Sequence, residues 1–164
     1  PSRIFVGESA NVDDIDVLVI DDEPLVLKML AANLTHGGFT YRCAESGRAA
    51  LPLLSHHRFK LIVTDIHMPD MDGLEVIMHC TASVPGVRIL AMSGGGRYNN
   101  ATDVLIPARI LGSSKSLIKP FGGPEFLEAV QELISGSELP RRLHRGEMDP
   151  TSPAFLAWFR QPRS

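Results

Sequence analysis

Polar residues able to bind a cation or a phosphoryl group end four separate apolar runs of this sequence. The runs have the length and β-branched content of buried parallel strands. Ligands bind beyond the carboxyl ends of the strands in an open α/β sheet, so we expect the residues that end these runs to share one edge. These residues are Asp21, Asp22, Asp65, Ser93 and Lys119.

The chemistry of this group of side chains is narrow. Three carboxylates at one edge repel one another and stay ionised together only when a cation lies between them. Oxygen ligands from few protein groups suit Mg²⁺, which keeps several waters and also binds phosphate. A lysine supplies a positive charge for a phosphoryl oxygen, and a serine hydroxyl supplies a hydrogen bond. The cluster therefore predicts a site for a phosphoryl group.

Five strands and five helices alternate along residues 14–136, which predicts an α/β domain with a parallel sheet covered on both faces. The expected strands are 17–20, 40–44, 60–64, 87–92 and 116–118. The expected helices begin at Pro24, after a Ser46 cap, near Gly73, near Asn99 and near Pro124.

Prolines and glycines predict where these helices are interrupted. Gly37 and Gly112 should end the first and fourth helices. Pro52 implies a kink or an early end in the second helix, and Pro107 should distort the fourth, because proline removes a backbone donor.

Composition and the flanking segments exclude several classes of function. We expect residues 1–13 to form an extended or disordered arm. We expect residues 137–164 to form a tail with one candidate short helix at 153–159. The net charge of −3 gives no general attraction to nucleic acid, and we expect none to bind directly. No apolar stretch approaches the ~20 residues that cross a bilayer, so we expect no membrane association. Cys43 and Cys80 are expected to be buried free thiols, which fits a cytoplasmic protein.

Four motifs, in order along the chain, resemble those of receiver domains of two-component response regulators. They are residues 17–24 (VLVIDDEP), 65–73 (DIHMPDMDG), 92–93 (MS) and 117–121 (LIKPF). The similarity covers roughly residues 14–136, and the motifs together are far more specific than any one of them. The resemblance implies a flavodoxin-like, doubly wound sheet with strand order 2-1-3-4-5 and five helices.

The resemblance assigns the phosphoacceptor role to Asp65, which lies before a Met-Pro turn that we expect to expose its carboxylate. Attack of a carboxylate on phosphorus gives an acyl phosphate. The resemblance also implies that Asp22 binds Mg²⁺ directly and Asp21 through water, and that Asp65 and the His67 main-chain carbonyl complete the ligands. Taken alone, Asp65 could instead cap a helix, and Glu23 is expected to face solvent.

Four further residues belong to the predicted switch, three as the resemblance implies and one as a departure from the family pattern. Lys119 would pair with a phosphoryl oxygen, and Pro120 after it is expected to follow a cis peptide bond. Ser93 would donate its hydroxyl to the phosphoryl group and couple the site to the glycine-rich loop that follows. Many receivers carry Tyr or Phe three residues before the lysine, but this chain has Ser116, which puts the usual aromatic coupling in doubt.

The sequence therefore predicts a phosphorylation-activated signalling switch rather than an enzyme. It would take its phosphoryl group from a histidine kinase or a histidine phosphotransfer protein. Only 28 residues follow Gly136, too few for a winged helix, so we expect a stand-alone receiver, although the chain could also be a fragment of a longer regulator. Its output would be a protein contact through the face of the fourth helix, fifth strand and fifth helix, with homodimerisation left open.

Two other functions are compatible with parts of the sequence. A degenerate receiver would bind partners without phosphorylation, and Ser116 with the two mid-helix prolines keeps that reading open. A Mg²⁺-dependent aspartyl phosphohydrolase resembling the haloacid dehalogenase superfamily is disfavoured. Such enzymes use an Asp-x-Asp pair, whereas Ile66 and His67 follow Asp65.

Overall fold

A computed structural model of the chain describes residues 14–84, 86–94 and 102–136. Strands and helices alternate throughout this part of the chain, as predicted. The strands are β1 (Asp14–Ile20), β2 (Tyr41–Ala44), β3 (Arg58–Asp65), β4 (Arg88–Ser93) and β5 (Lys115–Ile118). The helices are α1 (Pro24–His36), α2 (Gly47–His56), α3 (Gly73–Ser83), α4 (Thr102–Leu111) and α5 (Gly123–Ser135).

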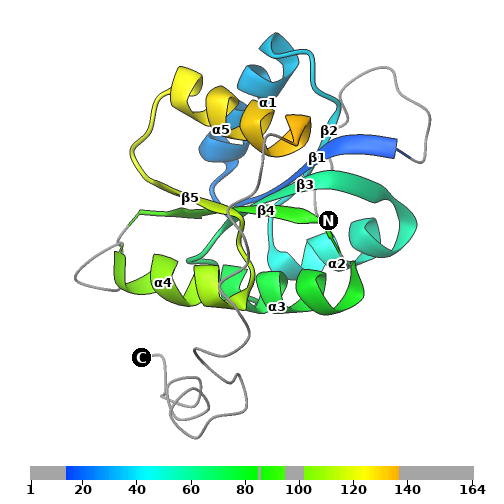
Figure 1. The fold of residues 1–164 in the computed structure, drawn as a ribbon, viewed down its shortest axis with the longest axis vertical. Helices are drawn as coiled ribbons and strands as arrows, with labels where there is room; N and C mark the ends of the chain where they lie inside the picture. The colour runs from blue at the N-terminus through cyan, green and yellow to red at the C-terminus, as the bar shows by residue number, and fades with distance from the viewer. Residues whose placement is uncertain (1–13, 85, 95–101, 137–164) are drawn as a thin grey trace, which may run out of the picture.

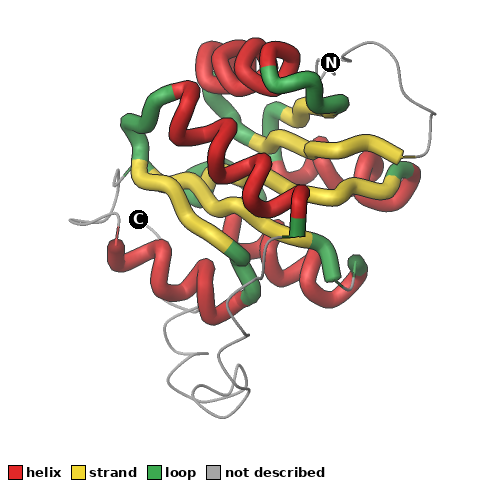
Figure 2. The backbone as a smooth tube through the Cα atoms, turned by 45° about the horizontal axis from the view of Figure 1, so that its top comes forward, coloured by secondary structure: helices red, strands yellow, loops and turns green. Residues whose placement is uncertain are grey.

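The strands form one parallel sheet in the order β2-β1-β3-β4-β5, which confirms the predicted topology. Figure 1 shows α1 and α5 on one face of the sheet and α2, α3 and α4 on the other. Figure 2 shows the same layers, with the strands enclosed between helices on both faces. All strands therefore run in one direction, and their carboxyl ends meet at one edge.

Alternating side chains of the strands supply two separate hydrophobic cores. Val17 and Val19 of β1 pack in the core under α1 and α5, whereas Leu18 and Ile20 pack in the core under α2, α3 and α4. The same alternation holds in β3 and β4, because successive side chains point to opposite faces of a sheet. A strand buried on both faces reads as a continuous apolar run, which is why these runs were recognisable in the sequence.

Local sequence signals set most helix ends. Pro24 occupies the first turn of α1, as expected, and the Ser46 hydroxyl accepts a hydrogen bond from the Ala49 N–H at the start of α2. A capping box of Asp72 and Glu75 begins α3. Gly112 follows α4 with a φ of +123°, a backbone conformation that residues other than glycine rarely adopt. The helix therefore ends where the sequence predicted.

The prediction that Pro52 could end the second helix early is wrong. The helix α2 continues through Pro52 to His56. The ring removes only one backbone donor, and Pro52 is exposed. Likewise α4 continues through Pro107 to Leu111, while the expected start of that helix near Asn99 lies outside the described residues.

The cysteines, the absence of membrane spans and the flanking segments were also predicted from the sequence. Cys43 and Cys80 are free and buried, as expected. Among the described helices, none is long and apolar enough to span a membrane. The N-terminal arm, the C-terminal tail with its candidate helix and the glycine-rich loop beyond Gly94 lie outside the described residues, so the division of the chain at 14 and 136 stays a prediction.

A polar cluster joins the first three strands away from the carboxyl edge. One Asp16 carboxylate oxygen accepts from the Thr40 N–H and hydroxyl, and the other lies 2.8 Å from the Lys60 ammonium nitrogen. Burial raises the pKa of Asp16, but the Lys60 and Thr40 hydrogen bonds outweigh burial, so the pKa lies below its ordinary value. The cluster therefore stabilises the fold when Asp16 is ionised.

We expect Asp16→Asn to lower the free energy of unfolding by about 1–2 kcal/mol at neutral pH, because it removes charge-assisted hydrogen bonds. A lowered folded-state pKa stabilises above the ordinary value, and this contribution is lost as pH falls through the folded pKa. The difference from the parent protein should thus shrink below about pH 4. Urea unfolding at both pH values measures it, and a difference independent of pH would contradict this assignment.

Candidate functional site

The register of the sheet brings the ends of four strands together. Ile20, the last residue of β1, pairs with Thr64 of β3, and the next residue, Asp65, pairs with Met92 of β4. Ser93 in turn pairs with Ile118 of β5. The candidate residues Asp21, Asp65, Ser93 and Lys119 thus lie at or one residue beyond strand ends on the same edge.

Lys119 lies between two carboxylates at this edge. Its ammonium nitrogen is 2.7 Å from Asp21 Oδ2 and 2.8 Å from Asp65 Oδ1. A longer approach of 3.8 Å reaches Glu23, whose side chain is 67% exposed, as predicted. The Lys119 main-chain N–H donates to the Ser93 carbonyl at 2.8 Å, and the Lys119–Pro120 peptide bond is cis, which confirms that expectation. The lysine is therefore held through both its main chain and its side chain.

The Asp65 carboxylate is buried, which corrects the expectation that the Met-Pro turn exposes it. Asp65 is only 4% exposed. Its second oxygen, Oδ2, accepts the His67 main-chain N–H at 2.7 Å. The turn bends back on the carboxylate and donates to it rather than leaving it open to solvent. Both oxygens thus have a partner.

Burial decides the direction of the pKa shift for the two carboxylates of this site but not for the lysine. It raises the pKa of Asp21 to about 6, although hydrogen bonds from Lys119 and the Glu23 N–H favour the ionised form. Burial likewise raises the pKa of Asp65, again against Lys119. Burial lowers the pKa of Lys119, but its hydrogen bonds to the two carboxylates more than reverse this, and the net shift is upward. The single ammonium group of Lys119 therefore does not balance the negative charges of Asp21, Asp22 and Asp65.

Asp22 supplies the negative charge that remains unmatched. It is half-buried, and its carboxylate has no hydrogen bond or salt bridge with any residue that the structure describes. Its charge nevertheless raises the pKa of Asp65, so the two carboxylates interact. Mg²⁺ prefers such oxygen ligands and keeps several waters. The donors present fit this ion.

The number of side-chain ligands is small. Within the described ranges, no group of three His, Cys, Asp or Glu side chains is placed to hold a metal ion. The predicted direct ligands are only two carboxylates, Asp22 and Asp65, with the His67 carbonyl, so that result does not oppose them. Their role as ligands stays a prediction.

The two serines of the predicted switch occupy different environments. Ser93 is fully buried at the end of β4. Ser116 is half-buried in β5 and pairs with Ala91 of β4, two residues before Ser93. A serine here lies within the sheet that carries the site, but it presents far less side chain to α4 than an aromatic ring would.

Sequence reasoning missed the closest packing around the phosphoacceptor candidate. A Cβ added to Gly73 would lie 2.1 Å from the Asp65 carbonyl oxygen and 2.7 Å from the Ile66 Cα. The Gly73 N–H also donates to the Ile66 carbonyl at 3.0 Å. A glycine directly after the Asp72 cap was the available signal, because close backbone approach is a common reason for glycine at a helix start.

A family model described as the response regulator receiver domain matches residues 17–131. The chain belongs to this family. Receiver domains are phosphoacceptors that histidine kinases phosphorylate, and they generally bind Mg²⁺ at the acidic site. In this receiver domain, Asp21, Asp65 and Lys119 lie together at the carboxyl edge of the sheet.

Curated relatives are longer response regulators. The receiver is 31% identical over 142 residues to the response regulator protein FleR of Pseudomonas aeruginosa, a match that covers 85% of this chain and 29% of FleR. It is 31% identical over 120 residues to the transcriptional regulatory protein KdpE of Mycobacterium tuberculosis, covering 72% of this chain and 50% of KdpE. Because the chain spans about a quarter to a half of such relatives, the stand-alone arrangement stays a prediction.

Solved receiver structures share the fold. The receiver domain of NtrX from Brucella abortus has a TM-score of 0.67 at 23% identity, covering 73% of this chain and 98% of that one. The chemotaxis protein CheY4 of Vibrio cholerae has a TM-score of 0.64 at 24% identity, covering 75% and 99%. At these identities the likeness shows the fold alone.

We expect Gly73→Ala to lower the free energy of unfolding by about 1–3 kcal/mol, since the added methyl group overlaps the main chain at Asp65. The matched control is Gly122→Ala, where the new Cβ meets the Pro124 Cδ at an ordinary 3.6 Å. Loss of a glycine N-cap there should cost no more than about 1 kcal/mol. Urea unfolding compares the two, and equal losses would show that the Gly73 contact is not special.

Proposed function

We propose that this receiver is a phosphorylation-activated signalling switch whose phosphoacceptor is Asp65. Its donor would be a phosphohistidine on a histidine kinase or a histidine phosphotransfer protein. The observation that supports this most strongly is the placement of Lys119, whose ammonium nitrogen lies 2.8 Å from Asp65 and 2.7 Å from Asp21. A half-buried lysine paired with a carboxylate at this edge could exchange that carboxylate for a phosphoryl oxygen.

The transfer is a nucleophilic displacement at phosphorus. An Asp65 carboxylate oxygen would form the new O–P bond while the N–P bond of phosphohistidine breaks, and the imidazole nitrogen would keep the electron pair of that bond. Lys119 would then pair with a phosphoryl oxygen, and the Ser93 hydroxyl would donate to another. Both Asp65 oxygens have a partner in the resting structure, and we assign the attack to Oδ1, which would exchange its ion pair with Lys119 for the bond to phosphorus.

We assign Mg²⁺ to the carboxylate that has no partner among the described residues. Asp22, Asp65 and the His67 carbonyl would hold it directly, and Asp21 would contact it through water. When bound, the ion would neutralise charge between the carboxylates and the incoming phosphoryl group. Lys119 meanwhile neutralises Asp21 and Asp65, which keeps the nucleophile ionised despite its raised pKa.

Burial gives the site a route to a conformational signal. Asp65 and Ser93 are 4% and 0% exposed, so a phosphoryl group added between them needs room that the resting structure lacks. New charge-assisted hydrogen bonds to Ser93 and Lys119 would shift the ends of β4 and β5. Ser116, two residues from Ile118 on β5, would transmit this shift with a smaller side chain than an aromatic residue offers.

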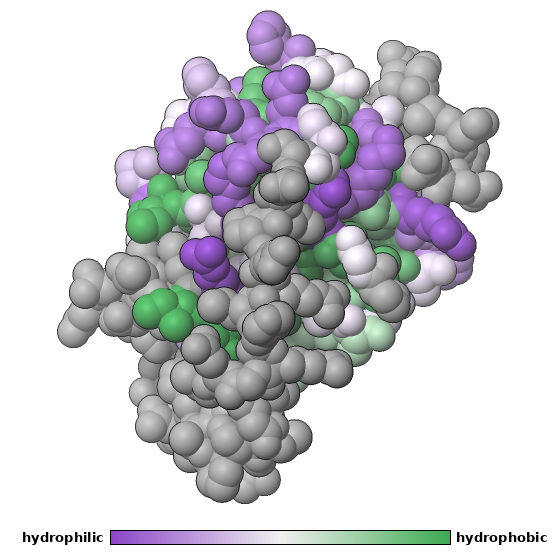
Figure 3. Space-filling model, in the orientation of Figure 1, coloured by the Kyte–Doolittle hydropathy of each residue, from purple (hydrophilic) through white to green (hydrophobic). Residues whose placement is uncertain are grey.

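The output face that we propose combines α4, β5 and α5. Ile106 of α4 and Ile118 of β5 are 58% and 51% exposed, so both elements offer an apolar side chain to a partner. Figure 3 shows hydrophobic residues, in green, beside the mainly hydrophilic surface over α1 and α5. A downstream protein with an apolar contact surface fits this face. Action by protein contact without direct nucleic-acid binding, a cytoplasmic location and the stand-alone arrangement belong to the same proposal.

A degenerate receiver is the second candidate, and Ser116 in place of an aromatic residue favours it. Such a protein would use the same face without phosphorylation. The two candidates differ in one chemical event, the modification of Asp65.

We expect incubation with acetyl phosphate and Mg²⁺ to add one phosphoryl group, because acetate can leave as the Asp65 O–P bond forms. Intact-mass spectrometry measures the gain. Asp65→Asn and a chelator should each abolish it. Asp70→Asn is the matched control, since Asp70 is exposed in the same loop, and it should be modified like the parent protein.

Two results would contradict the proposal. One is no gain of mass by a folded protein in the presence of Mg²⁺, which would favour the degenerate receiver. The other is an equal gain by Asp65→Asn, which would place the modification on another residue.

A further inference from the structure

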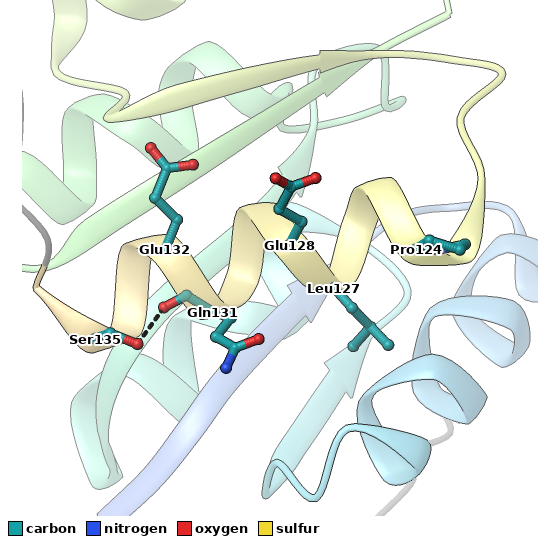
Figure 4. Close-up of a pocket in the computed structure, with 6 residues that line it drawn as sticks. All are labelled: Pro124, Leu127, Glu128, Gln131, Glu132 and Ser135. Atoms are coloured by element: carbon teal, nitrogen blue, oxygen red, sulfur yellow. Dashed lines mark hydrogen bonds between the residues drawn. The ribbon is translucent and has the colours of Figure 1, made fainter.

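The outer surface of α5 is strongly acidic. Glu125, Glu128 and Glu132 are all exposed, and the helix contains no lysine or arginine. Figure 4 shows Glu128 and Glu132 on the same side of the helix, whereas Leu127 points toward α1. The close approach of Leu127 to Gly37, at the end of α1, agrees with that view. The acidic surface therefore faces away from the core.

Little of this charge is matched within the described part of the chain. Glu132 forms a salt bridge with Lys115 of β5, but neither Glu125 nor Glu128 has one with any described residue. An open groove runs along the helix beside Glu128 and Glu132. It is lined by Pro124, Leu127, Glu128, Gln131, Glu132 and Ser135 (Figure 4). The surface suits a basic, partly apolar peptide.

A peptide of that chemistry follows directly in this chain. Residues 140–145 read PRRLHR, with Arg141, Arg142 and Arg145 around Leu143. The helix ends at Gly136, whose φ of +77° is a left-handed conformation that turns the chain out of the helical path. Glu147 is the first acidic residue after this arginine cluster.

The distances match those of a segment returning along α5. At a rise of about 1.5 Å per residue, Glu132 and Glu128 lie about 6 Å and 12 Å back from Gly136. An extended chain of about 3.3 Å per residue lets Arg141 and Arg145 reach at most about 17 Å and 30 Å from the same point. The arginines can therefore reach both glutamates with length left for the turn.

We infer that residues 140–145 of this chain dock on the outer surface of α5, with their arginines paired to Glu125, Glu128 and Glu132. The occupant is the same molecule because a short tether gives it an effective concentration in the millimolar range. Pairing at exposed glutamates is weak for each ion pair, so the contact depends on several arginines together. It also covers part of the proposed output face, a consequence that rests on the proposed function.

The test compares backbone amide NMR spectra of the full chain and of the triple variant Arg141→Glu, Arg142→Glu, Arg145→Glu. At about 0.01 M NaCl, where the Debye length is about 30 Å, we expect the amide signals of α5 to differ between the two. At about 1 M NaCl the Debye length falls to about 3 Å, and the difference should be lost. These substitutions follow Ser135, the last residue of α5, in the sequence, so the signals of the other helices and strands report whether the domain stays folded.

Two further variants separate docking from general charge effects. The double variant Arg160→Glu, Arg163→Glu changes arginines farther along the sequence, and it should leave the α5 signals unchanged. Glu128→Arg alone should reproduce the shifts of the triple variant around Glu128, and adding Arg142→Glu to it should restore part of the parent pattern. Restoration by the reversed pair is the result that a specific contact requires.

Two outcomes would overturn the inference. Identical α5 signals in the parent and the triple variant at low salt would show that the segment does not dock. Shifts that depend on protein concentration would assign the contact to a second copy of the chain. Intact mass after acetyl phosphate treatment of the same samples reports Asp65 modification separately, so failure of the proposed function and failure of docking are distinguishable.

Discussion

The site depends on one ammonium group held between two buried carboxylates. The Lys119 ammonium nitrogen lies within 2.8 Å of both Asp21 and Asp65. Without this ammonium, the two carboxylates would repel each other in a buried place where water does not screen their charges. Because the ionised forms are costly at this depth, burial raises the pKa of both acids. Asp22 adds charge that no described residue neutralises. We therefore expect this edge of the sheet to attract a further cation.

The rest of the fold serves to hold these groups in register. The central strand β3 places Asp65 beside Met92, and β5 places Lys119 one residue beyond its pair with the end of β4. Two apolar cores fix the strands from both faces, so their ends cannot slip independently. Gly73 lets α3 begin directly against the main chain at Asp65. A switch that moves these strand ends therefore acts on a rigid frame.

Most of the fold followed from the sequence because the central strands β1, β3 and β4 are largely buried on both faces, and because caps, glycines and prolines mark most of the helix ends. Strand order and the cis bond before Pro120 came from the resemblance, and periodicity could not have supplied them. The burial of Asp65 escaped prediction because it depends on how the following turn folds back. Pro52 misled because a helix tolerates one missing donor on an exposed surface.

Titration calorimetry without a phosphoryl donor measures the affinity for Mg²⁺ of the parent protein and of the variants Lys119→Met and Lys115→Met. If Lys119 competes with Mg²⁺ for the carboxylates, its removal should tighten binding by about tenfold, or about 1.4 kcal/mol. Lys115, at the start of β5, pairs with Glu132 of α5, and its replacement should leave the affinity unchanged. If a folded Lys119→Met protein binds Mg²⁺ more weakly or not at all, Lys119 does not compete with the ion for these carboxylates.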